Sequence, residues 1–557
     1  MTSDNDLIFL PLGGSGEIGM NMNLYGLGPA HARRWIMIDC GVTFGDHTSP
    51  GIDLITPDPA FILDEITGAA KLDGLILTHG HEDHIGAVAT LWPFLKCPIY
   101  ATAFTAALVE RKFQEKGIIG YPMNIIEMGS RHEVGLFDFE MVTLTHSIPE
   151  PSGVILRTPH GTVLHTGDWK IDPDPSLGPL TDSAKLRALG DDGVIAMVCD
   201  STNVLSAGES GSEARVRDSL IELIGKQKGR VAVTTFASNV GRLVSICEAA
   251  IANERSICLL GRSMFRMMDV AREVEILPPN IKFVEPEEAG FLPRENTLYL
   301  CTGSQGEGRA ALARIARDDH RDLVLNEGDT VIFSSKIIPG NERTIYDLQN
   351  QLVDNGVYII TEKDEFVHVS GHPCRDELAK MYDWVKPDLS IPVHGEARHL
   401  EEHAKFAKQQ GVKQAIAPRN GKMIRIAPGK PKIIDEVPVG RLYVDGHVLL
   451  RQGNGVMKER HRLAEGGHIT IAIALGDRND ILAPPEVNMR GVPPEDMAGI
   501  SLQELLEDAV EDAMDNMPKP RRGDDDEITR VMRKAVRGAL EKRWGKRSDI
   551  SVMVLRS

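Results

Sequence analysis

The chain has 557 residues, 42% of them hydrophobic, and this length excludes a single core because single domains usually stop growing at ~250–300 residues, so we expect two or three domains. No stretch approaches the ~18 unbroken apolar residues of a membrane helix, and we expect no membrane association. The net charge of −18 argues against a uniformly basic surface for nucleic acid, but it leaves open a local groove or a site where metal ions neutralise phosphate.

The N-terminus and the cysteines indicate a cytoplasmic protein. The opening residues are acidic before a short apolar run, and they lack the basic start and long apolar stretch of a secretory signal. Seven cysteines are scattered along the chain without a CxxC pair, which predicts reduced and mostly buried thiols.

Before residue 210 the chain alternates short β-rich runs with Gly, Asp or Thr. Examples are "WIMIDCG", "LDGLILTHG", "MVTLTHS" and "GTVLHTGD", and such short apolar runs predict buried strands. Several end in His, Asp or Thr, so we expect ligand-type side chains at one rim of a sheet, where active sites of layered α/β folds commonly lie. The stretch "GGSGEIG" contains the GxGxxG spacing of dinucleotide-binding proteins, but a lone match is weak, and a tight turn near this rim is favoured.

From residue 212 strands alternate with helices, which is the pattern of parallel βαβ units. The stretch "PDLSIPVHGEARHLEEHAKFAKQQG" then returns to a strand, a His-bearing turn and an amphipathic helix. If that histidine belongs with ligands earlier in the chain, the middle segment is an insertion into the first domain. The tail predicts a strand at 468–475, helices at 502–515 and 527–546 and a final strand, which together form a small α+β domain.

The chain is therefore expected to contain three domains. We place their segments at 1–211 (first domain, first part), 212–375 (insertion), 376–450 (first domain, second part), 451–467 (linker) and 468–557 (C-terminal domain).

The stretch "THGHEDHIGA" holds four ligand-type side chains in six residues, directly after an apolar run: His79, His81, Asp83 and His84. Imidazole and carboxylate are natural ligands of zinc, and two ions ~3.5–4 Å apart need about seven such groups, one of them shared. The alternate spacing turns His79 and His81 one way and lets Asp83 and His84 face another, so two adjacent ions can be bound. A solvated polar turn would explain an isolated HxH pair, but it does not explain four ligand types behind a buried strand.

This stretch resembles the HxHxDH signature of the metallo-β-lactamase superfamily. Other positions of that superfamily follow the same order: Asp39 in "WIMIDCG", His146 in "MVTLTHS" and Asp168 in "HTGDWKID". Alone, His146 would be interpreted as a core or capping histidine and Asp168 as a turn residue, but behind HxHxDH both become candidate ligands. The fold serves several chemistries, so the superfamily leaves the substrate open.

Three further motifs narrow the resemblance. "CDSTN" with Asp200, "FVHVSGHP" with His368 and His372, and "IPVHGE" with His394 resemble the motifs of the β-CASP nucleases. "LPLGGSGEIGMNM", "THSIPE", "GDWKID", "TFASN", "TGSQGE" and "SSKIIPGNE" resemble the ribonuclease J family in particular. The resemblance implies an α/β fold, in which a metallo-β-lactamase αββα sandwich carries an inserted β-CASP α/β domain and a small α+β C-terminal domain.

The resemblance also implies two zinc ions, with Mn²⁺ or Mg²⁺ able to substitute or assist. The ligands of one ion would be His79, His81, His146 and Asp168. The ligands of the other would be Asp83, His84, Asp168 and His394, with Asp168 shared. Two dications stabilise charge on a scissile phosphate and activate water near neutral pH.

Four residues are candidates for catalysis: His372, His368, Asp83 and Asp200. An imidazole near neutrality can protonate a leaving oxygen, and the resemblance gives this role to His372 and His368. Asp200 is expected to orient one of these histidines or a metal-bound group without binding the metal itself. Asp39 is expected to support a ligand in the same way. Asp83 is both a catalytic candidate and a metal ligand.

The implied substrate is single-stranded RNA. Residues expected to contact its backbone, partly through N–H groups that small residues expose, are His368, Ser370, Gly371 and His372. Residues expected to form a 5′-phosphate pocket are Ser238, Asn239, Ser304 and Gln305. The implied activity is 5′-to-3′ exonucleolytic degradation that favours 5′-monophosphate ends, with additional internal cuts, by a homodimer or homotetramer that works with RNA-degradation partners.

Two other functions stay open. A metallo-β-lactamase-fold hydrolase of small esters or thioesters would share the metal ligands, but it would not need the insertion and its motifs with His368, His372 and His394. A catalytically silent RNA-binding subunit would share the fold, but every ligand of the pattern is present here.

Overall fold

The computed structural model describes residues 5–557, and residues 1–4, at the start of the first predicted domain, lie outside the described chain. The chain splits into two compact units. The first holds the chain up to Thr43 together with Leu54–Leu442, and the second holds Phe44–Asp53 together with Tyr443–Ser557.

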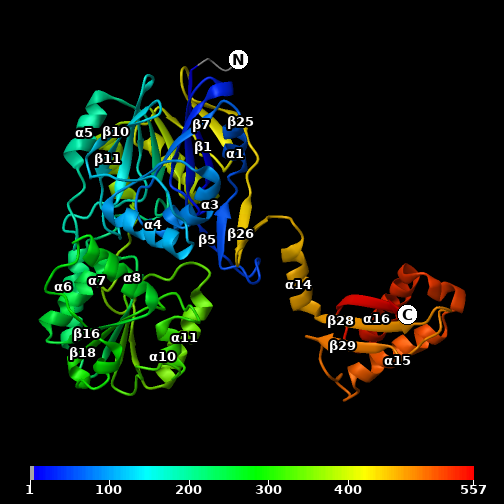
Figure 1. Cartoon of the computed structure of the whole chain (residues 1–557). Coiled ribbons are helices and arrows are strands. Elements are labelled where there is room, and N and C mark those ends of the chain that lie inside the picture. Colours follow the sequence, from blue (N-terminus) through cyan, green and yellow to red (C-terminus); the bar gives the residue numbers. More distant parts are fainter. Residues whose placement is uncertain (1–4) are drawn as a thin grey trace. The chain divides into compact units, whose positions relative to one another are not determined.

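The first unit contains a sandwich of two sheets (Figure 1). One has eight strands, in the order β25 (Lys432–Glu436), β24 (Lys422–Ala427), β1 (Asp6–Gly13), β3 (Met22–Gly28), β4 (Arg34–Ile38), β7 (Lys71–Ile76), β8 (Ile99–Ala101) and β9 (Met123–Ile125). The other has seven, in the order β10 (Arg131–Val134), β11 (Phe137–Thr143), β12 (Ser152–Thr158), β13 (Gly161–His165), β14 (Val194–Asp200), β21 (Leu389–Val393) and β23 (Gln414–Ala415). Phe9 and Ile36 of the first sheet share a buried cluster with Phe139 and Val198 of the second, so the sheets pack face to face.

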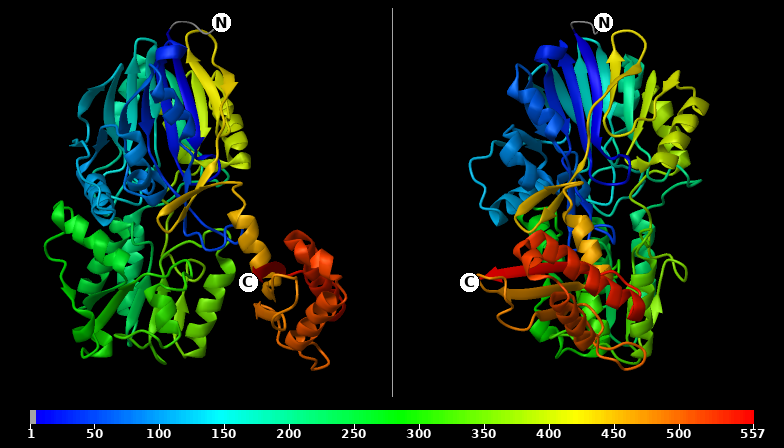
Figure 2. Two further views of the ribbon diagram at one scale, coloured as in Figure 1. Left: turned by 45° about the vertical axis from the view of Figure 1, so that its right-hand side comes forward. Right: turned by 90° about the vertical axis from the view of Figure 1, so that its right-hand side faces the viewer.

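Helices cover the outer faces of this sandwich (Figure 2). Those next to the eight-stranded sheet are α1 (Ala60–Thr67), α3 (Val88–Leu95) and α4 (Ala103–Glu115). Those next to the seven-stranded sheet are α5 (Ser183–Asp192), α12 (Arg375–Val385) and α13 (Ala397–Gln409). Leu186, Met381 and Phe406, one from each of the second set, pack with Ile155 and Met197 of the sheet. This αββα arrangement confirms the predicted fold class.

Between β14 and α12 the chain forms a third sheet, and all six of its strands are parallel. Their order is β17 (Phe283–Val284), β16 (Ser256–Leu260), β18 (Thr297–Cys301), β15 (Val231–Thr234), β19 (Thr330–Phe333) and β20 (Tyr358–Ile360). Its helices are α6 (Glu213–Gly225), α7 (Val240–Ala252), α8 (Arg262–Glu273), α9 (Pro286–Ala289), α10 (Ala311–Ala316) and α11 (Glu342–Asp354). β14 and β21, which flank the segment, pair directly with Asp200 opposite Val393. The segment thus lies between two paired strands of the sandwich, and its parallel sheet matches the alternation of strands and helices in the sequence.

The second unit contains a three-stranded sheet in the order β29 (Glu486–Arg490), β28 (His468–Leu475) and β30 (Asp549–Arg556), with helices α15 (Leu502–Asp515) and α16 (Asp525–Arg543). Ile469 and Ile471 of β28 pack on Leu506 of α15 and Met532 of α16. Helix α16 starts two residues before the predicted 527, because the side chain of Asp524 accepts hydrogen bonds from the first backbone N–H groups. Most of the predicted linker is helical and forms α14 (Val456–Gly466).

Short elements complete the chain: β2 (Ser15–Gly16), β5 (Thr43–Phe44), β6 (Leu54–Pro57), α2 (Glu82–Ile85), β22 (Gly395–Glu396), β26 (Arg441–Asp445), β27 (Val448–Arg451) and three 3₁₀ turns at Ala30–Ala32, Arg294–Asn296 and Lys519–Gly523. Within residues 5–557 no helix is long and apolar enough to span a membrane. All seven cysteines are buried and unpaired, as their scatter in the sequence predicted.

Candidate active site

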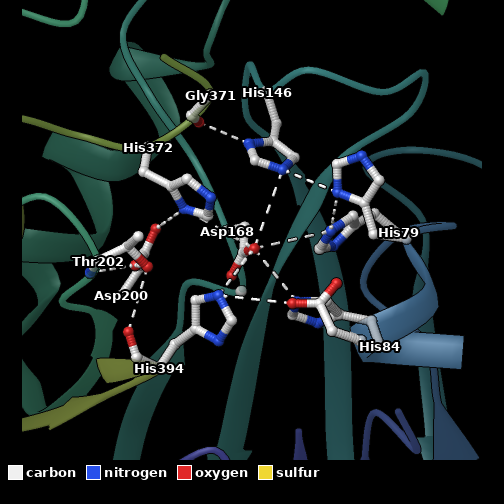
Figure 3. Close-up of polar contacts among 12 residues, drawn as sticks. His79, His84, His146, Asp168, Asp200, Thr202, Gly371, His372 and His394 are labelled. Atoms are coloured by element: carbon white, nitrogen blue, oxygen red, sulfur yellow. Dashed lines mark hydrogen bonds and ion pairs between the residues drawn. The ribbon is translucent and has the colours of Figure 1, made fainter. Parts of the chain in front are cut away.

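The predicted metal ligands lie beyond the ends of sandwich strands and converge at one rim (Figure 3). Three groups of side chains each have ligand atoms within 4.8 Å of one another. Two consist of predicted ligands alone, and the third joins Asp168 and His394 to Asp200 and His372. The members of the first are His79, His81, His146 and Asp168, and the members of the second are Asp83, His84, Asp168 and His394. The structure thus brings together all seven predicted ligands, and Asp168 belongs to both of these groups.

The surroundings of Asp168 fit a divalent ion. Asp168 Oδ2 lies 3.2 Å from His84 Nε2 and 3.4 Å from His394 Nε2. Its other oxygen, Oδ1, is buried and has no hydrogen-bond partner among the described residues. Buried polar atoms in folded proteins are almost always paired. Because imidazole and carboxylate are preferred donors for zinc, the unpaired oxygen is explained by a cation beside it.

Three histidines of the first group present ring nitrogens to one another. His81 Nδ1 lies 3.1 Å from His79 Nε2 and 3.1 Å from His146 Nε2. Burial lowers the pKa of His79 and His146 well below 6.5, and it lowers the pKa of His81 to about 4. At neutral pH the rings are therefore uncharged, and their facing lone pairs are suited to a metal ion.

Hydrogen bonds to Nδ1 hold the rings of two predicted ligands, His84 and His79. Asp39 Oδ2 lies 2.7 Å from His84 Nδ1, which is the kind of support expected of Asp39. Thr78 donates its hydroxyl proton to Asp39 and lies 3.0 Å from His79 Nδ1, so it accepts from that ring. Burial opposes charge on His84, but the surrounding carboxylates raise its pKa well above 6.5. Sequence reasoning missed Thr78, although it directly precedes the HxHxDH stretch.

The glycine-rich stretch forms the tight turn expected near this rim. Gly14 has φ +79°, and its carbonyl accepts from the backbone N–H of His394 at 2.7 Å. A Cβ at Gly14 would lie 2.2 Å from Asn21 Oδ1, so glycine leaves room for this side-chain amide. Asn21 Nδ2 in turn lies 3.0 Å from His394 Nδ1 and 3.2 Å from His84 Nε2. Asn21 was also missed, and its only signal is its place after the turn.

His372 and Asp200 form a hydrogen-bonded pair beside Asp168 (Figure 3). His372 Nδ1 lies 2.8 Å from Asp200 Oδ2 and 3.8 Å from Asp168 Oδ2. Thr202 holds the other oxygen of Asp200 by donating from both its backbone N–H and its hydroxyl. Burial lowers the pKa of His372, but Asp200 and the other nearby carboxylates raise it to about 9. The ring stacks on that of His394, with centroids 5.6 Å apart, so the insertion reaches the metal rim.

The loop before His372 also contacts a predicted ligand. The carbonyl of Gly371 accepts from His146 Nδ1 at 2.5 Å. A Cβ at Gly371 would lie 2.9 Å from His146 Cε1 and 2.8 Å from Ser147 Oγ, so only glycine allows this close approach. Ser370 Oγ accepts from the backbone N–H of His372 at 3.2 Å. The structure therefore brings Ser370, Gly371 and His372 to the rim together, and sequence reasoning missed the Gly371 carbonyl.

His368 lies apart from this cluster. Its Nδ1 is 3.5 Å from the guanidinium of Arg242, and within the described chain no hydrogen bond or ion pair joins its side chain to a predicted metal ligand. Burial and then the charges of Arg242, Lys336 and Lys170 lower its pKa to about 3. Its ring is therefore neutral at physiological pH, which does not support the proton-donor role predicted for it.

The residues expected at a 5′-phosphate pocket lie on the insertion. Ser238 and Asn239 follow β15, and Ser304 and Gln305 follow β18. These parallel strands are neighbours and end at the same sheet edge, so the two stretches lie side by side. Asn239 Oδ1 caps α7 by accepting from the backbone N–H of Arg242, and the Gln305 amide holds the loop after β19 at both its oxygen and its nitrogen. The Asn239 and Gln305 side chains are thus already engaged, whereas neither the Ser238 nor the Ser304 hydroxyl makes a hydrogen bond within residues 5–557.

Family models match successive parts of the chain. The beta-lactamase superfamily domain matches residues 34–188, and the beta-CASP domain of ribonuclease J matches residues 228–352. The Zn-dependent metallo-hydrolase RNA specificity domain matches 356–418, and the ribonuclease J C-terminal domain matches 455–557. The fold and the His/Asp cluster thus define a metallo-β-lactamase-type hydrolase with an inserted β-CASP domain.

Curated relatives named ribonuclease J extend this likeness over the whole chain. The protein from Sinorhizobium meliloti is 47% identical over 555 residues, which cover 100% of this chain and 98% of that one. The protein from Corynebacterium glutamicum is 35% identical over 99% of this chain and 76% of its own. The protein from Thermus thermophilus is 34% identical over 84% of this chain and 82% of its own. The chain belongs to the ribonuclease J family, and the resemblance seen in the sequence is confirmed.

Proposed function

We propose that the chain is a metal-dependent ribonuclease that hydrolyses phosphodiester bonds of single-stranded RNA. The observation that carries this proposal is the position of Asp168, which is shared by both ligand groups, keeps one unpaired oxygen and lies beside His372. Metal ligands and a proton donor therefore meet at one point. Full-length similarity to proteins named ribonuclease J supports RNA as the substrate.

The two alternatives are less favoured. A hydrolase of small esters or thioesters has no need of the β-CASP and RNA specificity domains that this chain carries. A silent RNA-binding subunit has no need of a complete ligand set, and all seven side chains converge here.

The metal centre is proposed to hold two Zn²⁺ ions, with Mn²⁺ or Mg²⁺ able to substitute or assist. His79, His81 and His146 favour Zn²⁺ in the first group, because Mg²⁺ prefers oxygen ligands. When bound, two such ions stabilise negative charge on a phosphoryl group and make water nucleophilic at neutral pH. The second group, which includes Asp83, is richer in carboxylate and shares Asp168 with the first.

His372 is proposed to protonate the 3′ oxygen that leaves the phosphate. Its Nδ1 is engaged by Asp200, so Nε2 is the nitrogen available to the substrate. With its pKa raised to about 9, the ring is protonated at neutral pH and its Nε2–H can be donated. Asp200 both orients the ring and stabilises its charge.

RNA is proposed to be degraded from 5′ to 3′, with preference for a 5′ monophosphate and with additional internal cuts. Ser238 and Ser304 supply hydroxyls at one edge of the insertion sheet, on loops that Asn239 and Gln305 hold in place. Hydroxyls and backbone N–H groups can satisfy the oxygens of one phosphate. They do not balance the added charge of a triphosphate.

The assembly is proposed to be a homodimer or homotetramer that works with RNA-degradation partners in the cytoplasm. Seven buried and unpaired cysteines support a reducing compartment.

Metal analysis together with digestion of 5′-labelled RNA tests the proposal. The expected result is bound zinc and release of labelled mononucleotide from 5′-monophosphorylated RNA, with triphosphorylated RNA cut mainly at internal sites. Equal mononucleotide release from mono-, tri- and unphosphorylated forms of one RNA would contradict recognition of the 5′ end. Inert RNA together with hydrolysis of a thioester would favour the other enzyme class.

A further inference from the structure

Asn203 connects the sandwich to the loop that carries Ser370 and His372. It lies in the turn after β14, at the point where the chain enters the insertion. Its Nδ2 is 2.7 Å from Ser370 Oγ and 3.1 Å from the carbonyl oxygen of His372. A carbonyl oxygen can only accept, so the nitrogen of the Asn203 amide, and not its oxygen, faces the loop. Asn203 therefore donates one N–H to each partner.

These contacts fix the direction of the Ser370 hydroxyl. Ser370 Oγ accepts from Asn203 and also from the backbone N–H of His372. A hydroxyl has two acceptor lone pairs and one proton. With both lone pairs used, the proton can only be donated outwards, and no acceptor for it is found among residues 5–557. The half-buried Ser370 thus presents a hydrogen-bond donor beside His372.

Asp200 and Asn203 act on this loop in opposite ways. Asp200, an acceptor, engages His372 Nδ1 and leaves Nε2–H to donate. Asn203, a donor, engages Ser370 Oγ and leaves its O–H to donate. Two side chains three residues apart, one at the end of β14 and one in the turn after it, therefore make both loop residues donors. Donors of this kind match phosphate oxygens, which only accept, and hydrogen bonds to an ionised acceptor are the stronger ones.

We infer that Asn203 is a positioning residue that orients Ser370 as an obligate hydrogen-bond donor to a phosphate oxygen of RNA next to His372. The inference rests on the proposed ribonuclease function, because that function places a phosphate at the rim. Asn203 acts through Ser370 and does not itself touch the substrate.

Two substitutions at Asn203 distinguish an effect on the direction of the Ser370 hydroxyl from an effect of losing the contact with the His372 carbonyl. Asn203→Asp keeps the size of the side chain, but a carboxylate only accepts, so Ser370 turns its proton inwards. Asn203→Ala loses the same contact with His372 but leaves Ser370 able to donate outwards. Combining each with Ser370→Ala completes a double-mutant cycle, which isolates the coupling between the two positions.

The cycle is measured on the metal-loaded protein in two ways. One is kcat/KM for a 5′-monophosphorylated RNA, and the other is Kd for the 2′-O-methyl RNA of the same sequence, which resists hydrolysis. We expect Asn203→Asp to weaken both by about 10- to 30-fold and Asn203→Ala by only about 3-fold, in line with the loss of a hydrogen bond to a charged group. In the Ser370→Ala background the two Asn203 variants should agree within about 2-fold, since no hydroxyl remains to be oriented. Zinc content should be unchanged throughout.

Equal losses for Asn203→Asp and Asn203→Ala would overturn the inference. So would the same difference between them in the Ser370→Ala background, because added charge would then explain it. Cleavage of RNA by the wild type without the expected coupling would remove the inference and leave the proposed function. Binding of RNA with the expected coupling but without cleavage would support the inference and remove the proposed function, and a wild type that neither binds nor cleaves RNA would overturn both.

Discussion

The metal rim of the sandwich and the edge of the insertion sheet differ in what their polar side chains contact. At the rim, Asp168 Oδ1 has no partner in the described part of the chain, and His81 Nδ1 faces two other ring nitrogens. At the sheet edge, Asn239 caps a helix and the Gln305 amide holds a loop. An unpaired buried carboxylate oxygen among converging histidines indicates a missing cation, because buried polar atoms are usually paired. The side chains suited to bind metal therefore lie at the rim, whereas the Asn239 and Gln305 side chains hold the loops of the sheet edge in place.

Replacing Asp168 should have the largest effect. Asp168→Ala removes a ligand from both groups, so bound zinc should be lost and RNA hydrolysis should fall by more than about 10⁴-fold, since several kcal/mol of charge stabilisation is lost with the ions. His81→Ala, which affects only the first group, should lose less metal. Zinc per chain, initial rates and circular dichroism together test this. Near-normal cleavage by His81→Ala with full metal content would refute the ligand assignment.

Replacing His372 should slow cleavage without releasing metal. His372→Ala removes the proposed proton donor, and the usual loss for a general acid is about 10²- to 10⁴-fold. Zinc content should stay at the wild-type value, because His372 is not among the proposed ligands. Loss of zinc in this variant would instead make His372 a ligand.

The pH dependence should report the pair of His372 and Asp200. The donor form is the protonated ring, and its pKa is raised to about 9, so its contribution is present below that pH and is lost as the pH rises through it. Asp200→Asn removes the strongest raising partner, so the pKa should fall and the loss of activity should begin at a lower pH. Values of kcat for the wild type and Asp200→Asn, measured from about pH 6 to about pH 10, test this. An unchanged alkaline limb would show that His372 is not the titrating donor.

Adding a methyl group at Gly371 should affect both metal and activity. In Gly371→Ala the new Cβ meets His146 and Ser147 at under 3 Å, so the loop must shift and its carbonyl leaves His146. Such a lost support typically costs about 10- to 100-fold in metal affinity or activity. Gly538→Ala on α16, where a Cβ meets nothing within 4 Å, is the matched control. Wild-type zinc affinity in Gly371→Ala would show that the Gly371 carbonyl does not support the ligand.

The smallest effect is expected at the sheet edge. Asn239→Ala removes a helix cap, which costs about 1 kcal/mol of folding free energy, so Tm should fall slightly. The ratio of rates on 5′-mono- and triphosphorylated RNA should stay unchanged, whereas Ser238→Ala or Ser304→Ala should lower it. A lost preference in Asn239→Ala with unchanged Tm would place the Asn239 side chain in the pocket.

The sequence predicted the rim well because its pattern is local. HxHxDH places four ligand-type side chains in six residues, and the other ligands each follow a β-rich run whose end can be recognised. The parallel sheet of the insertion was likewise visible as strands alternating with helices. The hypothesis that His394 joins the earlier ligands required β14 and β21 to be neighbours. They do pair, and the strand ends that carry the ligands therefore lie together.

The supporting contacts carry no such pattern. Thr78, Asn21 and Asn203 are single polar residues, and the partners of Asn21 and Asn203 lie far along the chain. The Gly371 contact is made by a backbone carbonyl, which every residue has, so only the missing side chain marks it.

At His368 the motif and the surroundings of the side chain point to different roles. The motif placed it with His372, but the two side chains on this short loop meet different neighbours, Arg242 for His368 and Asp200 for His372. A motif gives positions along the chain, whereas the role of each side chain depends on the charges that surround it.

The central claim is that two ions, bound by groups that share Asp168, are required for RNA hydrolysis. Titrating Zn²⁺ into the metal-free protein while following hydrolysis of a 5′-monophosphorylated RNA tests it directly. The rate should stay near zero up to one equivalent of zinc per chain and should reach its plateau at two. A plateau already at one equivalent, or no hydrolysis with two bound, would contradict the account.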